Sequence, residues 1–283
     1  MPVILVTGAT GTVGREVVAQ LLAAGQPVRG MTRYPAKVKF DPRVEVVQGD
    51  FADADSLAKA VNGTDRVFSL ALGPQTGAHE RALAAAAKKE GVLQIVKLGA
   101  MGGDGETRNA IRRWHEEGEQ AVRDSGIPWT VVRPGRFMSN ALHWRESIRR
   151  QGKVFSNYGD GKLPSVHPRD IAAVAVRALT SEDYFGRALE VTGPVALSIA
   201  EEVAILSNAL AKPIEFVSIT DEAARKDMER ANMPAYIIDG LLPFAEFVRS
   251  GKAARVFPTV EEVTGRPALS FAEWAREHAP AFQ

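Results

Sequence analysis

Cysteine is absent from this chain of 283 residues, which excludes disulfides, thiolate catalysis, iron–sulfur clusters and cysteine-based zinc sites. An excess of one charge is also lacking, because 35 Lys and Arg residues stand against 34 Asp and Glu residues, a formal net charge of +1. Such a balance offers no global electrostatic attraction to nucleic acid or to a membrane surface. We therefore expect neither as a partner.

Long hydrophobic runs are missing as well. No stretch approaches the roughly 20 apolar residues that span a bilayer. The apolar run at Met1–Thr7 is too short for a signal peptide and has no basic region before it. Hydrophobic residues nevertheless make up 45% of the chain and charged residues 24%, as in an ordinary globular protein. We expect a cytoplasmic protein, a monomer or homodimer.

What the first half contains is an alternation of short strand-like runs and helical patterns. Strands are predicted over residues 3–7, 27–32, 44–48, 66–70, 92–98 and 129–133, and helices over Val13–Ala24, Asp53–Val61, Ala78–Glu90 and Thr107–Ser125. Such alternation produces βαβ units and a parallel sheet. The prediction is an α/β, Rossmann-like, doubly wound parallel sheet with strand order 3-2-1-4-5-6.

The second half is less regular. Gly152–Pro168 is rich in turn residues and predicts a loop or hairpin, whereas Asp170–Leu179 and Ser198–Ala211 have helical patterns. Further strands are predicted at Ala188–Thr192 and Ile214–Ser218. We expect a nucleotide-binding domain over residues 1–150 and a smaller, mostly helical substrate-binding cap over 151–283, with some segments returning to the sheet.

The sharpest motif is glycine-rich and lies between the first predicted strand and the first helix. Its glycines at 8, 11 and 14 suit a tight turn, a close approach of pyrophosphate to the backbone, and close helix packing, respectively. The helix N-terminus then offers free N–H groups to phosphates. A glycine-rich turn that binds nothing is the alternative. The predicted phosphate-binding residues are Gly8, Thr10, Gly11, Thr12, Val13 and Gly14.

The end of the second strand indicates which dinucleotide is bound. NAD would need an Asp or Glu there for the ribose 2′-hydroxyl, but the chain has Met31-Thr32-Arg33-Tyr34. Arg33 can bind a 2′-phosphate, and Lys37 could add a second charge. NADP is therefore favoured over NAD, although Arg33 could also be one more solvated arginine.

Two later loops complete the predicted cofactor site. Asp50 follows the third strand and could accept from the adenine amino group, with Phe51 beside the ring, unless Asp50 only shapes a turn. Leu72 and Gly73 follow the fourth strand in a loop expected to run beneath the cofactor.

Together these residues resemble the NmrA-like group of atypical short-chain dehydrogenases/reductases. Four stretches carry the resemblance: Thr7–Gly14, Gly49-Asp50, Ser125–Gly135 with Phe137-Met138, and His167–Ala172. The resemblance implies a Rossmann domain, a small C-terminal substrate domain and, in most members, a nicotinamide cofactor. The group includes quinone and azo reductases, redox-sensing regulators and tailoring proteins of natural-product pathways.

Typical short-chain reductases use Ser, Tyr and Lys, with the last two spaced Tyr-x-x-x-Lys. Of the four tyrosines only Tyr158 has a lysine four residues on, Lys162, in the turn-rich stretch 152–168. The predicted helix Thr107–Ser125 after the fifth strand holds no tyrosine, so we do not expect that apparatus there. The resemblance places a histidine or lysine near the cofactor at His115, which is the candidate catalytic residue. Glu119 shares its helix face and could orient the ring and raise its pKa. A structural His–Glu pair is the alternative, and residue 119 being Glu excludes an H-E-x-x-H metal site.

Other polar and aromatic residues follow the fifth and sixth strands. Lys97 is expected to reach a surface edge. Arg133 could bind an acidic or phenolic substrate or form a structural salt bridge. Phe137 and Met138 could line a pocket for a flat substrate or belong to the core.

Three functions remain open at this point. The first is an NADP(H)-dependent oxidoreductase that acts on a planar quinone-like or polycyclic aromatic acceptor, whose ring spreads the developing charge and so needs a less elaborate acid. The others are a tailoring enzyme that oxygenates or rearranges an aromatic natural product, and a non-catalytic NADP-sensing regulator, because a fold does not dictate a function.

Overall fold

The computed structural model describes residues 1–102 and 109–283. The chain forms two compact units, and each is assembled from separated segments. The first unit comprises residues 1–101, 113–134 and 168–190, and the second comprises 102–112, 135–167 and 191–283. A boundary after residue 150 was expected, with some later segments returning to the sheet, and the helix and strand of residues 168–190 do belong to the first unit. Residues 135–150 lie in the second unit instead.

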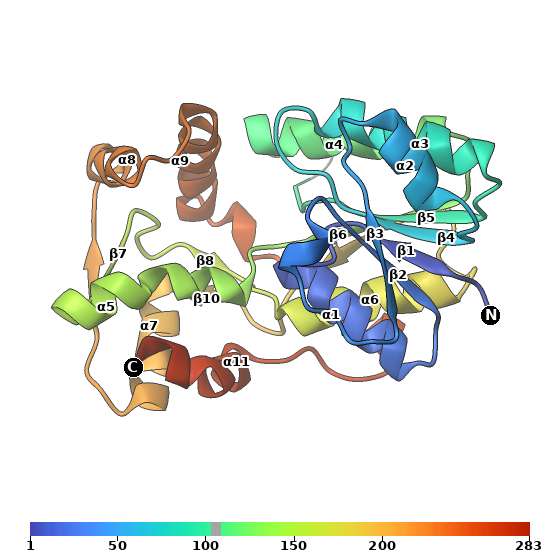
Figure 1. The fold of residues 1–283 in the computed structure, drawn as a ribbon. Coiled ribbons are helices and arrows are strands. Elements are labelled where there is room, and N and C mark those ends of the chain that lie inside the picture. The colour runs from blue at the N-terminus through green and yellow to red at the C-terminus, as the bar shows by residue number, and fades with distance from the viewer. Residues whose placement is uncertain (103–108) are drawn as a thin grey trace. The chain divides into compact units, whose positions relative to one another are not determined.

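The first unit is a seven-stranded sheet with helices on both faces (Figure 1). Its strands are β1 (Ile4–Val6), β2 (Val28–Thr32), β3 (Val44–Gln48), β4 (Arg66–Ser69), β5 (Gln94–Leu98), β6 (Trp129–Pro134) and β9 (Arg187–Val191). They lie in the order β3-β2-β1-β4-β5-β6-β9, and the pairings among the first six are all parallel. The predicted order is confirmed, with β9 added beside β6.

The helices of this unit divide between the two faces of the sheet. One face carries α1 (Thr12–Ala23) and α6 (Pro168–Thr180), and the other carries α2 (Ala54–Val61), α3 (Thr76–Lys89) and α4 (Ala110–Asp124) (Figure 1). The predicted start of the fourth helix at Thr107 lies outside the described residues. The core under α2 and α3 is aliphatic, with Leu57, Val67, Leu83 and Ile95 fully buried. This packing makes the sheet a rigid base for the loops at its carboxyl edge.

The second unit is mostly helical. Its elements are α5 (Arg145–Gln151), β7 (Lys153–Ser156), β8 (Lys162–Leu163), β10 (Leu197–Ser198), α7 (Ile199–Leu210), β11 (Glu215–Ser218), α8 (Asp221–Arg230), α9 (Ala235–Arg249), α10 (Thr259–Thr264) and α11 (Phe271–His278). Short 3-10 turns cover Pro35–Lys37 in the first unit and Met138–Trp144, Lys252–Ala254 and Ala279–Phe282 in the second. Among the described residues, no helix is both long and apolar enough to cross a membrane.

Of the two alternatives expected over residues 152–168, a loop or a hairpin, the hairpin is wrong. β7 pairs in parallel with β11, and β8 pairs antiparallel with β10, so both partners come from beyond residue 190. Local turn residues do not reveal such distant pairing. The helix α7, by contrast, begins where the sequence predicts, because Ser198 and Glu201 form a capping box at its N-terminus.

Candidate functional site

The glycine-rich loop has the geometry of a phosphate cradle. Gly8 adopts a positive φ of 61°, and the Gly11 N–H donates to the Gly8 carbonyl at 2.9 Å. A Cβ on Gly14 would lie 2.1 Å from that same carbonyl oxygen. The exposed Gly11 is the N-cap of α1, so the first N–H groups of the helix, which have no partner within it, lie just after the carboxyl end of β1. These residues fit a dinucleotide pyrophosphate.

The other residues predicted in this loop are arranged around the cradle. Thr12 is exposed and Thr10 half-buried, whereas the side chain of Val13 lies in the core and leaves only its backbone for a ligand. Thr7 links the cradle to the next strand, because its hydroxyl oxygen accepts from the Leu70 N–H at 2.8 Å. The loops after β1 and β4 are therefore held together.

Two exposed basic residues, Arg33 and Lys37, follow β2. The guanidinium of Arg33 lies 5.7 Å from the ring centre of Tyr34, and the ammonium of Lys37 lies 5.0 Å from it. Tyr34 is itself 57% exposed. Two cations on one aromatic platform, with no carboxylate in the Met31–Tyr34 stretch, fit a ribose 2′-phosphate better than a 2′-hydroxyl.

The loop after β3 shows the turn-forming role of Asp50, while its contact with adenine stays a prediction. One carboxylate oxygen accepts from the Ala52 N–H at 3.0 Å, which is the turn-forming role. Phe51 stacks on His79 of α3 with ring centres 5.5 Å apart. Sequence reasoning missed His79, because its contact with Phe51 joins α3 to a loop 28 residues earlier.

The loop after β4 begins in the core and ends in solvent. Ala71 is buried and its N–H donates to a carboxylate oxygen of Glu80 at 3.2 Å. Leu72 is 67% exposed, and Gly73 has a φ of 92° that favours glycine. The Gly73 carbonyl accepts from the Thr76 hydroxyl at 2.6 Å, which closes the loop onto the first turn of α3.

His115 lies half-buried on α4, between the buried residues Trp114 and Glu119. Glu119, expected to orient His115, uses both carboxylate oxygens to bind Arg133: Nε donates at 3.2 and 3.1 Å, and Nη2 donates at 2.6 Å. The role of Glu119 in orienting His115 stays a prediction.

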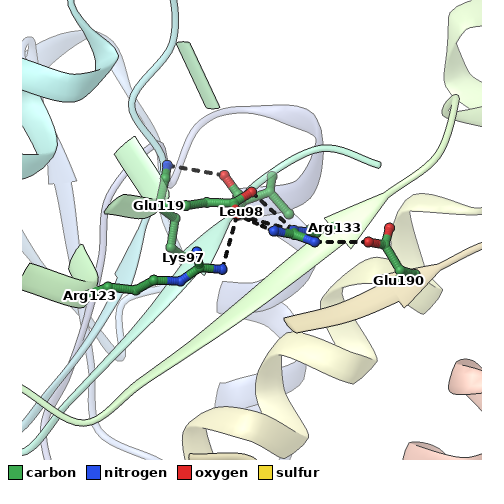
Figure 2. A network of polar contacts seen from close by, with 6 residues as sticks. All are labelled: Lys97, Leu98, Glu119, Arg123, Arg133 and Glu190. Atoms are coloured by element: carbon green, nitrogen blue, oxygen red, sulfur yellow. Dashed lines mark hydrogen bonds and ion pairs between the residues drawn. The ribbon is translucent and has the colours of Figure 1, made fainter. Parts of the chain in front are cut away.

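Arg133 is the centre of an ion network at the ends of β5, β6 and β9 (Figure 2). Besides Glu119, it binds Glu190 at 3.1 Å, and Arg123 reaches Glu119 at 3.6 Å. Burial opposes the charged form, but hydrogen bonds that Arg133 donates to the two carboxylates, together with their negative charge, raise the pKa of its guanidinium far above the usual value. This arrangement favours the structural salt bridge that the sequence left open, and the role of Arg133 in binding a substrate stays a prediction.

Lys97 does not reach a surface edge, so that expectation is wrong. Its side chain is fully buried and pairs with the equally buried Glu80 at 2.7 Å. The reason is topological: β5 lies inside the sheet between β4 and β6, with helices on both faces.

The predicted substrate residues of the second unit lie in and beside its core. Met138 is 1% exposed and packs with Ile148, Phe271 and Trp274, whereas Phe137 is half-buried. Arg136 pairs with the buried Glu202 at 2.8 Å. The core position of Met138 favours the alternative that it is a packing residue.

Comparisons with known proteins agree with this geometry. The sequence profile of the NAD(P)H-binding family matches residues 8–182. The chain is 47% identical over 281 residues to the (4-alkanoyl-5-oxo-2,5-dihydrofuran-3-yl)methyl phosphate reductase of Streptomyces griseus, covering 99% of both chains. It is 40% identical to the NAD(P)H azoreductase of Xenophilus azovorans, again over 99% of both.

Solved structures extend the likeness. The NADPH-dependent quinone oxidoreductase of Escherichia coli, complexed with NADPH, is 25% identical with a TM-score of 0.86, over 97% of this chain and 99% of that one. NmrA, a negative transcriptional regulator, shares the fold at 19% identity and a TM-score of 0.75, over 99% of this chain and 96% of that one. The predicted resemblance and the preference for an NADP cofactor are confirmed. The chain belongs to the NAD(P)H-binding family and is an NAD(P)H-dependent oxidoreductase.

Proposed function

We propose that the protein uses NADPH to reduce a small planar acceptor of the quinone or polycyclic aromatic type. The observation that supports the proposal is that the charged side chains near the ends of β5 and β6 are already engaged in ion pairs within the protein. Lys97 is bound to Glu80, and Arg133 to two carboxylates. Only one tyrosine, Tyr158, has a lysine four residues on, and it packs against the core of the second unit while its Lys162 binds Glu201 at 2.7 Å. A simple ketone, which needs a strong proton donor at its oxygen, is therefore a poor substrate for this site.

A conjugated acceptor makes a smaller demand. Bound NADPH supplies a hydride, which carries two electrons to the acceptor. The negative charge that develops is spread over the ring, and one further proton completes the reduced product. We assign the supply of that proton to His115 or to solvent, since histidine can exchange protons near neutral pH.

The relatives support the same chemical class. Their names include an azoreductase, a quinone oxidoreductase and a reductase of a furanone phosphate. A furanone that carries an alkanoyl group is a second candidate substrate, favoured by the 47% identity to the Streptomyces griseus enzyme. Its ring double bond is conjugated with carbonyl groups, so the same spreading of charge applies.

The test is the consumption of NADPH, followed by absorbance, with four acceptors: a quinone, an azo dye, an alkanoyl-furanone phosphate and an unconjugated ketone. We expect turnover with at least one conjugated acceptor and none with the ketone. Gly11→Val, which blocks the phosphate cradle, is the control for protein-dependent turnover. Reduction of the ketone as fast as the best conjugated acceptor would contradict the proposal.

A further inference from the structure

The buried ion pair between Lys97 and Glu80 has no assigned role. Both side chains are fully buried, and the ammonium and carboxylate lie 2.7 Å apart. Gly118 of α4 closes over them, because a Cβ there would lie 2.8 Å from Cε of Lys97. The pair is thus sealed from solvent beside the carboxyl ends of β4 and β5.

The carboxylate of Glu80 is fully bonded to two strands and a loop. One oxygen accepts from Lys97 and from the Ala71 N–H at 3.2 Å. The other accepts from the hydroxyl of Ser69, the last residue of β4. The ammonium of Lys97 also donates to the Leu98 carbonyl at 3.3 Å (Figure 2). Glu80 therefore fixes the point at which the chain leaves β4.

Stability alone does not account for such a pair. Removing two charges from water is costly, and well-packed apolar residues in place of a buried pair are often equally stable or more so. What apolar residues cannot supply is an acceptor for the Ala71 N–H. Because that N–H begins the loop of residues 71–74, the Glu80 carboxylate sets the path of the loop.

We propose that Glu80, held by Lys97, is a positioning residue that fixes this loop against the nicotinamide half of NADPH. The inference rests on the proposed cofactor site, in that the loop runs beneath the cofactor. Hydrogen bonds at three points hold the loop: the Ala71 N–H donates to Glu80, the Thr76 hydroxyl and N–H donate to the Gly73 carbonyl, and the Leu70 N–H donates to Thr7 of the phosphate loop. The exposed Leu72 lies between the first two.

Two matched double variants separate positioning from packing. Glu80→Gln/Lys97→Met and Glu80→Met/Lys97→Met both remove the buried charges and keep similar volumes. Only the glutamine retains an oxygen that can accept from the Ala71 N–H. Each protein is titrated with NADPH and with 2′,5′-ADP, which has the 2′-phosphate and adenosine but no nicotinamide.

In the Glu80→Met/Lys97→Met variant we expect the Kd for NADPH to rise about tenfold, the scale of one lost hydrogen bond, with the Kd for 2′,5′-ADP unchanged. The glutamine variant should bind NADPH within about twofold of the unmodified protein. The proposal is overturned if both variants bind NADPH alike, or if both ligands weaken together.

Hydrogen exchange of the unmodified protein gives a second readout should a variant fail to fold. The Ala71 amide should be protected without any ligand, and an amide that exchanges like an open loop overturns the proposal. Failure of the proposed function is distinct, because a protein that reduces none of the conjugated acceptors can still show this difference between the two ligands.

Discussion

The basic residues at two places along the same edge of the sheet differ in their burial and in their ion pairs. After β2, Arg33 and Lys37 are exposed beside the ring of Tyr34, and neither forms an ion pair with another residue of the part that the structure describes. Around the ends of β4, β5 and β6, Lys97 and Arg133 are buried and pair with carboxylates. Both stretches lie where open α/β sheets bind ligands. The position of a basic residue at this edge therefore does not tell whether it binds a ligand or stabilises the fold. Whether its side chain is paired with a buried carboxylate does.

The largest expected effect compares two glycines of the phosphate loop, one exposed and one buried. Gly11→Val should abolish cofactor binding and keep the fold, because Gly11 is exposed with an ordinary φ of −81°. Gly14→Ala should disrupt the fold itself, since its Cβ would lie 2.1 Å from the Gly8 carbonyl oxygen. Circular dichroism and NADPH titration measure the two effects. Normal NADPH binding by Gly11→Val would show that the cradle lies elsewhere.

His115 tests whether a half-buried group on α4 takes part in the reaction. His115→Ala should lower turnover with a conjugated acceptor by about 10²–10⁴, the usual range for a positioned acid–base group. His115→Gln separates two roles, because an amide can hydrogen-bond a ribose but cannot exchange a proton near neutral pH. Rescue by Gln indicates positioning, and loss in both variants indicates proton transfer. Full activity of His115→Ala would make the histidine structural.

A substitution of Arg133 tests whether this buried basic residue stabilises the fold rather than binding a ligand. Arg133→Leu removes the bidentate partner of the buried Glu119 and should lower the free energy of unfolding by about 3 kcal/mol. The estimate takes the low end for a broken buried pair because Arg123 remains 3.6 Å from Glu119. Urea denaturation measures the loss. The double variant Arg133→Leu/Glu119→Leu should recover part of it, and an Arg133→Leu protein of unchanged stability with weakened substrate binding would restore Arg133 as a substrate residue.

A substitution of Arg33 should weaken cofactor binding and leave the stability of the fold unchanged, whereas a substitution of Arg133 should lower the stability. Arg33→Asp places repulsion against a 2′-phosphate and an acceptor beside a 2′-hydroxyl, so NADPH affinity should fall by about one to two orders of magnitude and NADH binding should improve. Unfolding in urea should be unchanged, because Arg33 is exposed. Fluorescence titration with both cofactors checks this. Equal binding of NADPH and NADH by the unmodified protein would contradict the assignment.

The sequence predicted the structure best where a feature is encoded by residues close together in the chain. The glycine spacing at 8, 11 and 14 and the alternation of strands and helices predicted the cradle and the order of six strands, because each feature is encoded within about 30 residues. The burial of Lys97 was missed for the opposite reason. The predicted strand order already placed the fifth strand inside the sheet, but a lysine there was expected to extend to the edge. Its buried partner Glu80 lies 17 residues away on α3, and no local pattern indicates that pairing.

The second unit was the least predictable part of the chain. The pairing of β7 with β11 joins residues about 60 positions apart, and turn residues between 152 and 168 suggested a hairpin instead. The ion pair of Arg136 with Glu202 spans 66 positions. Contacts at such separations depend on the whole fold, which a periodicity of two or 3.6 residues does not encode.

The smallest expected effect concerns an exposed pair in the second unit, Asp221 with Arg249 at 2.8 Å. The hydrogen bond from Arg249 lowers the pKa of Asp221, and Asn157 adds to the shift. Because the folded pKa lies below the unfolded value of about 3.9, the stabilisation is present above that pH and is lost as the pH falls through the folded pKa. Solvent screens the pair, so Asp221→Asn should cost only about 0.2–1 kcal/mol at neutral pH.

This small loss should disappear in acid, where the unmodified protein also loses the bond. Urea denaturation at neutral pH and at acidic pH measures the difference, with Asp227→Asn as a control on an exposed pair with Arg230. A cost for Asp221→Asn as large as that for Arg133→Leu would contradict the comparison, because exposed and buried pairs would then stabilise this protein alike. A cost that persists in acid would mean that the carboxylate acts through packing rather than charge.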